Sequence, residues 1–491
     1  MRRSPGLGAL AAVGLAAFLT SLDSTVVTVA LPQLQRELHL SPSDLEWVAV
    51  AYPLAYAALL LMGGQTADRY GHRSTLLAGT ALFTAASVLC ALATGGPVLM
   101  TGRLVQGAAA ALIFPAALAV VTHDLPAPLR TVGVSLLTAA VAAALATGPV
   151  ISGVLTQHLG WPSLFAINIP LAGAAWWAMA ATMPKEPQVT SHPAADGTAR
   201  PVGDAPWDMA LICLALAGYA FSLIEGHRQG LSPAVLAAAA TATAALLYVT
   251  AHQVLTTTPL PAVALLRHRT FTGGILAQLL WGLGVNGVFF FTAPYLHNAA
   301  GLNPTATGLA FTPIAGSLLL ATPLLPTAVS RYGARAVVVT GLLSLAAGMA
   351  YLACIAPTAR LELLLPGFAV IGAGSALAIP LTTCALQCAP KAHSASAAGV
   401  FSAAREASGV LGIAVIGAVA ASGGQLAADT DPHTSAQGYR TALIAAAVLV
   451  ATSAPTAWWA LTSAISPTAR PRPLRKPRVG SAPAEPHDTD A

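Results

Sequence analysis

Long apolar stretches alternate with short polar turns along nearly the whole chain. A helix needs about 20 mostly apolar residues to cross the hydrocarbon core of a bilayer. The pattern therefore predicts an all-α polytopic membrane protein with fourteen transmembrane helices. The predicted spans are 7–31, 44–64, 74–94, 97–122, 131–156, 163–183, 207–225, 233–251, 271–296, 305–327, 336–356, 361–389, 396–421 and 439–463.

Basic residues fall mostly on one side of this predicted topology. With both termini in the cytoplasm, seventeen of the 23 Lys and Arg residues lie in inside segments, four outside and two within spans. Cytoplasmic loops of membrane proteins carry such an excess of positive charge. The bias favours an even number of spans and cytoplasmic termini.

Composition excludes several other classes of protein. Only 8% of residues are charged, against about 25% in soluble domains. We interpret the basic stretch 470–478 as part of a cytoplasmic tail near anionic lipid, the alternative being a nucleic-acid patch, and expect no nucleic-acid partner. The sequence lacks a H-E-x-x-H run, a G-x-S-x-G elbow and a P-loop, so we expect neither an enzyme nor ATP as the energy source. No metal or other cofactor is expected.

A short internal repeat indicates duplicated halves. Asp68–Arg73 reads DRYGHR and Ser330–Arg335 reads SRYGAR, and both follow the first helix of a pair on the cytoplasmic side. Duplicated halves around a central site are typical of secondary transporters. The predicted domains are an N-terminal six-helix bundle (1–183), a cytoplasmic linker (184–206), an extra helix pair (207–251), a C-terminal six-helix bundle (252–463) and a basic tail (464–491).

Several motifs occur in order along the first half. They are LDSTVVTVALP at 22–32, GQTADRYGHR at 64–73, RLVQG at 103–107, GPVISG at 148–153 and WPSLFAINIP at 161–170. Together they resemble the major facilitator superfamily, and more closely its fourteen-helix drug:proton antiporters, including actinomycete antibiotic exporters of the methylenomycin-resistance type. Thr28, His72 and Ser152 depart from the Asn, Arg and Gly that are common in these motifs, and Ala144 stands where a preceding Gly is common.

The resemblance implies a function and an energy source. A protein of this kind exports hydrophobic or amphiphilic drugs or antibiotics across the plasma membrane in exchange for protons, by alternating access. Its partners are the small-molecule substrate, protons and membrane lipid, and the proton gradient takes the place of a cofactor. The alternative is a carrier for a nutrient, a siderophore or a lipid on the same scaffold.

Asp23 and Arg103 are the first candidates for proton coupling. Counting about 1.5 Å per residue from the span centres puts them roughly 6 and 9 Å to the outer side of the midplane, so they could meet if their helices are neighbours. A carboxylate persists in hydrocarbon mainly where it faces water or a partner. Coupling is one hypothesis, supported for Arg103 by the resemblance, and a static pair or a solvated cavity wall is the other.

Glu406 is a further candidate for binding a proton or a cationic substrate, the alternative being compensation of a buried charge. Arg405 precedes it, and neighbouring helix residues point about 100° apart, so the two need not pair. Glu225, near the outer end of its span, is expected to reach water. Sparse polar and aromatic groups in apolar spans suggest an amphipathic cavity, although many could face lipid. The candidate cavity residues are Gln106, Asn168, Trp281 and Asn286.

Two motifs are expected to control conformation. The resemblance implies a gating loop at Gly64, Asp68, Arg69, Gly71 and Arg73, whose alternative is a simple basic cytoplasmic loop. The antiporter motif comprises Gly148, Pro149 and Gly153. Ala144, Gly148 and Ser152 are small residues at four-residue spacing on one helix face, which lets another helix approach closely. Pro149 removes a helix hydrogen bond. The motif could seal the outer side against leak, or serve plain helix packing.

Overall fold

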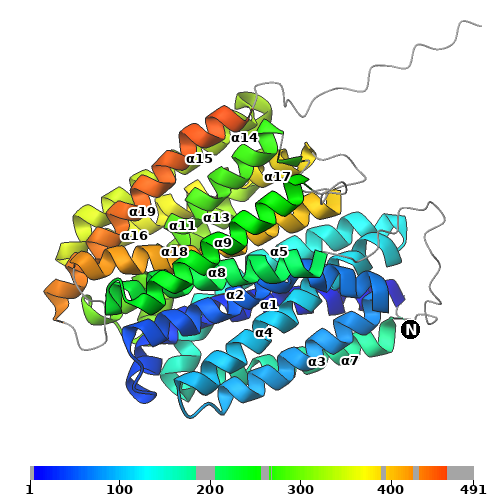
Figure 1. Cartoon of the computed structure of the whole chain (residues 1–491), viewed down its shortest axis with the longest axis horizontal. Coiled ribbons are helices and arrows are strands. Elements are labelled where there is room, and N and C mark those ends of the chain that lie inside the picture. Colours follow the sequence, from blue (N-terminus) through cyan, green and yellow to red (C-terminus); the bar gives the residue numbers. More distant parts are fainter. Residues whose placement is uncertain are drawn as a thin grey trace, which may run out of the picture.

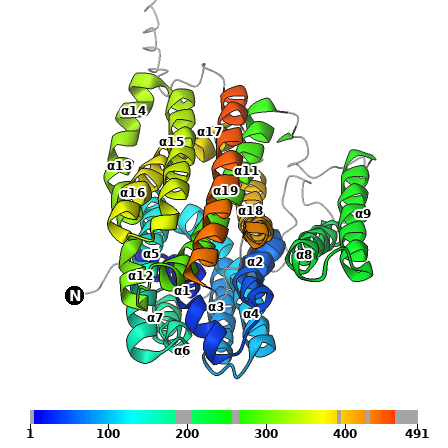
Figure 2. The same cartoon turned by 90° about the vertical axis from the view of Figure 1, so that its left-hand side faces the viewer.

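Two helical bundles lie side by side, and a helix pair flanks them in this computed structural model (Figures 1 and 2). The structure describes residues 5–183, 205–255, 265–266, 268–388, 394–423 and 431–461. Within these ranges the regular secondary structure is helical. The predicted linker, apart from residues 205 and 206, and the predicted tail at 464–491 lie outside the described residues.

The first bundle is built from the helices that precede the linker. They are α1 (Pro5–Glu37), α2 (Pro42–Tyr70), α3 (His72–Ala91), α4 (Gly96–Ala119) with the π-helical turn η1 (Val120–Asp124), α5 (Ala127–Leu159), α6 (Pro162–Ala166) and α7 (Asn168–Thr182). Local sequence fixes where some of them begin. At α2, Ser41 and Asp44 form a reciprocal capping box, which satisfies two backbone N–H groups that the first helical turn leaves free.

The flanking pair and the second bundle follow. The pair is α8 (Ala205–Gln229) and α9 (Pro233–Leu255). The second bundle contains α11 (Arg269–Asn298), α12 (Pro304–Ala310), α13 (Thr312–Ala321), η2 (Thr322–Leu324), α14 (Leu325–Tyr332), α15 (Ala334–Ile355), η3 (Ala356–Thr358), α16 (Leu361–Ala378), α17 (Pro380–Gln387), α18 (Ser394–Gly423) and α19 (Pro432–Ala460).

All fourteen predicted ranges overlap these helices, but fewer satisfy the requirements of a membrane span. Among the described residues, 12 helices are long and apolar enough to cross a bilayer. A thirteenth is α2, which bends by 53° between Pro42–Leu60 and Met62–Tyr70. In α8 the apolar stretch Ala210–Gly226 is shorter than a full span. The chain is thus a multi-pass membrane protein, and the fourteenth span stays a prediction.

The two copies of the internal repeat adopt the same turn. Gly71 and Gly333 have φ angles of 93° and 81°, a region that residues with a Cβ disfavour. Each glycine N–H donates a 2.9 Å hydrogen bond, to the carbonyl of Ala67 and of Val329 respectively. Each glycine therefore ends one helix and starts the next at corresponding places in the two bundles.

The arginine that follows each turn holds the last helix of its own bundle. Arg73 donates to the carbonyls of Met183 (3.1 Å) and Ala180 (3.2 Å) at the end of α7. The Arg335 guanidinium lies 3.7 Å from the ring centroid of Trp458 on α19. The first contact is a pair of hydrogen bonds and the second a cation–π contact, but each arginine joins its turn to the last helix of its own bundle.

The bundles share a core at one end of the molecule. We call the end where α1 meets α2 the distal end, and the end with Gly71 and Gly333 the proximal end. One hydrophobic cluster combines the distal half of the first bundle, including Leu31 and Leu34, with residues of the second bundle such as Tyr295. The proximal half of the first bundle has a separate core around Phe83 and Leu76. The bundles are therefore packed together mainly at the distal end.

Candidate functional site

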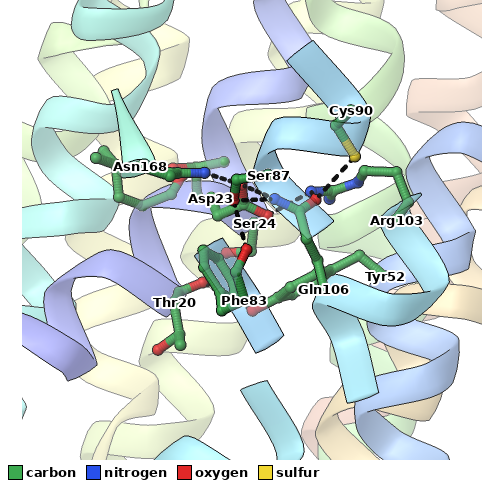
Figure 3. Close-up of polar contacts among 12 residues, drawn as sticks. Thr20, Asp23, Ser24, Tyr52, Phe83, Ser87, Cys90, Arg103, Gln106 and Asn168 are labelled. Carbon is green, nitrogen blue, oxygen red and sulfur yellow. Dashed lines mark hydrogen bonds and ion pairs between the residues drawn. The ribbon is translucent and has the colours of Figure 1, made fainter. Parts of the chain in front are cut away.

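Asp23 and Arg103 meet in the interior of the first bundle (Figure 3). Asp23 lies on α1 and is 0% exposed, and Arg103 lies on α4 and is 2% exposed. Arg103 Nη1 donates directly to Asp23 Oδ2. Two charged groups are thus removed from water as a pair, which avoids the large cost of burying either one alone.

Amide side chains complete the shell around this carboxylate. Asn168 Nδ2 of α7 donates to Asp23 Oδ1 at 2.6 Å, and Gln106 Nε2 of α4 donates to the same oxygen at 3.2 Å. Arg103 Nη1 also donates to Gln106 Oε1 at 3.0 Å. Asp23 of α1 is therefore held by side chains that α4 and α7 contribute.

A second layer orients Gln106 and covers the guanidinium. Gln106 Nε2 donates to Ser87 Oγ at 2.9 Å, and Cys90 Sγ donates to Gln106 Oε1 at 3.5 Å. The Arg103 guanidinium carbon lies 4.6 Å from the ring centroid of Tyr52 on α2, a distance at which a cation is attracted to an aromatic face.

Not every polar atom of this cluster is satisfied. Arg103 Nε and Asn168 Oδ1 are buried and have no hydrogen-bond partner among the described residues. Unmade hydrogen bonds in the interior are costly. The cluster therefore has one donor and one acceptor that a rearrangement of the site could use.

The second bundle carries another ion pair, between Arg405 and Glu406 of α18. Arg405 Nη2 and Nε lie 2.9 and 3.2 Å from Glu406 Oε1. Adjacent positions on a helix did not predict a pair, but the long side chains of Arg405 and Glu406 contact each other. The arginine side chain is 49% exposed and the glutamate 19%, so this pair is more open than the Asp23 site.

Two tyrosines of α2 lie between the ion pairs. Tyr56 interacts electrostatically with Arg405 and Glu406. Tyr52 interacts with Asp23, Arg103 and also Glu406, and its hydroxyl donates to the carbonyl of Thr20 at 2.9 Å. The rings of Tyr52 and Tyr56 are 6.1 Å apart. Tyr52 thus contacts Arg103 of the first ion pair, and Tyr56 lies next to it on α2.

The four candidate cavity residues separate into two groups. Gln106 and Asn168 are fully buried in the shell of Asp23. Trp281 and Asn286 lie on α11 of the second bundle; the Trp281 indole N–H has no partner among the described residues, and Asn286 Nδ2 donates to the carbonyl of Gly282 at 2.8 Å. The Asn286 side chain lies beside Gly409, one turn beyond Glu406 on α18.

The antiporter motif lies where α5 contacts both bundles. Ser152 Oγ donates to the carbonyl of Val26 on α1. On another side of α5, a Cβ at Gly153 would collide with the carbonyl of Pro304 on α12. A Cβ at Gly308 would likewise collide with the carbonyl of Pro149. Glycines on both helices therefore permit backbone contact between the bundles at the distal end.

The gating loop lies at the proximal end and is largely open. The Asp68 side chain is 80% exposed and lies 3.9 Å from His72 Nε2. His72 Nδ1 lies 2.9 Å from an oxygen of Asp124. Arg69 covers the ring of the adjacent Tyr70 at 5.4 Å. The Asp68 carboxylate is therefore largely exposed to solvent.

Gly64 completes the residues expected in this loop. It lies within α2 rather than in the turn, near Pro115 of α4. It belongs to the proximal half of the helix after the bend at residue 61. The close approach of α2 to α4 is at the preceding Gly63, where a Cβ would collide with the carbonyl of Ala111, whereas a Cβ at Gly64 would make only an ordinary contact with Pro115.

Several polar residues of these sites were not predicted from the sequence. Ser87 and Cys90 lie three residues apart on α3 and both face Gln106. Their spacing is that of one helix face, which was the one indication in the sequence. Tyr52 gave no such indication. Glu225 was expected to reach water, but it is 8% exposed because α8 packs against α2 and α18.

The fold is thus two bundles of membrane-spanning helices, with a buried ion pair in one and a partly open pair in the other. The sequence profile of the Major Facilitator Superfamily matches residues 13–413 and 270–486. The chain belongs to this superfamily.

Characterised relatives cover most of the chain. It is 33% identical to the Methylenomycin A resistance protein of Streptomyces coelicolor, covering 82% of this chain and 83% of the relative. It is 29% identical to the Tetracenomycin C resistance and export protein of Streptomyces glaucescens (84% and 76%) and 30% identical to the Multidrug resistance protein Stp of Mycobacterium tuberculosis (86% and 77%).

Solved structures share the fold at low sequence identity. A D-xylose-proton symporter has a TM-score of 0.64 at 16% identity and covers 93% of this chain and 98% of its own. A bacterial homologue of the human lysosomal transporter Spinster, solved in an inward-facing and unoccupied conformation, has a TM-score of 0.63 at 15% identity (94% and 98%). These two comparisons concern the fold alone.

Proposed function

We propose that this protein is a proton-coupled antiporter that exports hydrophobic or amphiphilic drugs or antibiotics across the plasma membrane. The buried pair of Asp23 and Arg103 is the observation that carries the proposal. An ionisable pair inside a transporter bundle is the kind of group through which protons are relayed. Export, rather than uptake, is supported by the relatives, which are named as resistance, export and multidrug resistance proteins.

Coupling follows from the two states of the Asp23 carboxyl. Ionised, it is stabilised by Arg103, Gln106 and Asn168. Protonated, it loses its attraction for the guanidinium, and Arg103 needs other partners. The ring of Tyr52 and the amide of Gln106 already contact it. Proton binding would in this way change the packing of α1 against α4, and thus the balance between transporter states.

Alternating access would use the two ends of the molecule. The distal end faces outside in this proposal, and the contact between α5 and α12 closes it. The proximal end, where the Asp68 side chain is 80% exposed, would face the cytoplasm and form the open side. Both termini would then be cytoplasmic, with α8 as the fourteenth span. The Arg405–Glu406 pair and Asn286 would line the path from the proximal side.

Reconstitution in liposomes tests the proposed function. We expect an imposed pH gradient to drive transport of lipophilic dyes and antibiotics by the wild-type protein, and a protonophore to stop it. Transport of sugars, siderophores or lipids instead would favour the alternative carrier. Gradient-independent transport of the drugs would refute proton antiport while leaving export standing.

A substitution at Gly308 tests whether the contact between α5 and α12 closes the distal end. We expect Gly308→Ala to separate the bundles at the distal end, because the added methyl group would collide with the carbonyl of Pro149. Accessibility of a cysteine introduced at Ser152 to a water-soluble maleimide should therefore rise. Gly316→Ala on α13 is the matched control, since nothing lies within 4 Å of the place that its methyl group would take. Equal labelling of both variants would contradict a closing role for this contact.

A further inference from the structure

Glu46 is a buried acid that belongs to neither ion pair. It lies on the second turn of α2, near the distal end, and is 4% exposed. Its Oε2 atom is buried and has no hydrogen-bond partner among the described residues. A carboxylate in this position is costly unless it is paired or carries a proton.

Three parts of the protein meet around this side chain. Gly417 of α18 faces it, and a Cβ there would lie 2.7 Å from Glu46 Oε1. On α8, Glu225 interacts with it electrostatically. The rings of Trp47 and Phe221, 6.3 Å apart, join α2 to α8 beside this point. The Glu46 carboxyl is therefore enclosed by the first bundle, the second bundle and the flanking pair.

The charged groups of these elements do not neutralise Glu46 in the described structure. On α2, the Asp44 carboxylate is engaged by Ser41. On α8, the group that acts on Glu46 is Glu225, which has the same charge. Glu225 Oε2 accepts a hydrogen bond from Gln229 Nε2 at 2.7 Å. The basic or titratable residues next to Glu225 in the sequence are His227 and Arg228. The distal half of α18, residues 409–423, has no titratable side chain in its sequence.

This enclosure exists only while the distal end is closed. Glu46 and Gly417 belong to different bundles, so separating the bundles would open the carboxyl to water. Water stabilises the ionised form, whereas the closed contact accommodates the neutral acid without an unpaired buried charge. A ligand that binds one state more tightly shifts the population toward that state.

We propose that Glu46 is a second proton-binding site, and that a proton on Glu46 stabilises the closed distal end. The site takes up a proton as the α2–α18 contact forms and releases it to water as that contact opens. This inference rests on the proposed alternating access, but it does not depend on which substrate is carried. The extra helix pair would contribute to it through Glu225.

Distance measurements between spin labels test this site without any substrate. Labels at Thr94 and Thr358, exposed positions between helices at the distal end of each bundle, would be introduced after replacing the five native cysteines. All variants carry Asp23→Asn, which removes the titration of the first site. One proton bound only in the closed state changes the closed-to-open ratio by up to about ten-fold per pH unit, so we expect the open population to rise with pH.

Adding Glu46→Gln should abolish this residual pH dependence, because the neutral amide cannot titrate. Glu362→Gln, at an exposed distal acid on α16, is the matched control and should retain it. The proposal is overturned if the Glu46 variant keeps the pH response of its parent, if the parent has none, or if the Glu362 control loses it equally.

A second variant acts on the same contact without removing the acid. Gly417→Ala would press a methyl group against the Glu46 carboxyl. We expect it to increase the open population at every pH and to shift the transition toward lower pH. An unchanged transition would show that the α18 surface does not sense Glu46. These measurements contain no substrate. They would therefore still test the Glu46 site even if the protein proved not to transport drugs.

Discussion

Asp23→Asn is expected to abolish pH-gradient-driven efflux of drugs from liposomes, down to the level of protein-free vesicles. The amide is close in shape to the carboxyl and its oxygen can still accept from Arg103, but it cannot bind and release a proton. Asp23→Asn leaves the buried Arg103 charge without its counter-ion, which costs stability, but the protein should still fold because Arg103 keeps its contacts with Gln106 and the ring of Tyr52. Efflux under an imposed gradient is the measurement.

Exchange without a gradient provides the control for this variant. Counterflow of labelled against unlabelled substrate needs binding and alternation but no net proton movement, so we expect Asp23→Asn to retain it. Loss of both activities would instead indicate a structural defect. Gradient-driven efflux that survives in the variant would move the proton site elsewhere, and Glu406 would be the next residue to test.

Arg103→Met is expected to lower the free energy of unfolding by about 3 kcal/mol, because it leaves an ionised carboxylate buried without its counter-ion. Methionine retains much of the apolar stem, so the change reports the charge more than the packing. The expected loss is at the lower end of the range for broken buried pairs, since Asn168 and Gln106 still donate to Asp23. Equilibrium unfolding in mixed detergent micelles measures it.

The double variant separates charge from packing. In Asp23→Asn with Arg103→Met both charges are gone, and neutral replacement of a buried pair costs little. We expect the double variant to be more stable than Arg103→Met alone. Equal stability of the two would mean that the loss in the single variant comes from packing against Tyr52 and Phe165, not from the orphaned charge.

Much of the candidate site could be anticipated because depth in a membrane follows from position along a helix. A rise of about 1.5 Å per residue put Asp23 and Arg103 at similar levels before any contact was known. The position along a helix does not say which way a side chain faces around the helix axis. It therefore gave no reason to join Asn168 to Asp23, to pair Arg405 with Glu406, or to bury Glu225.

The burial of Glu46 likewise could not be predicted from its position along the helix. From the sequence it is one of several acids near the start of a predicted span, and such residues ordinarily reach water. Its burial depends on Gly417 of α18, which is more than 350 residues later in the chain, and on α8. Contacts between elements so distant in sequence leave no periodic pattern in either one.

By itself, the sequence determined the helices, the duplicated turns at Gly71 and Gly333 and the family, because apolar length, glycine positions and motif order are local properties of the chain. Only the tertiary structure decided which faces meet. It enclosed Asp23 within one bundle, brought the glycines of α5 and α12 into backbone contact, and joined the two bundles through a shared core at the distal end. Those outcomes depend on how the bundles dock, and docking is set by the combined shape of many helices.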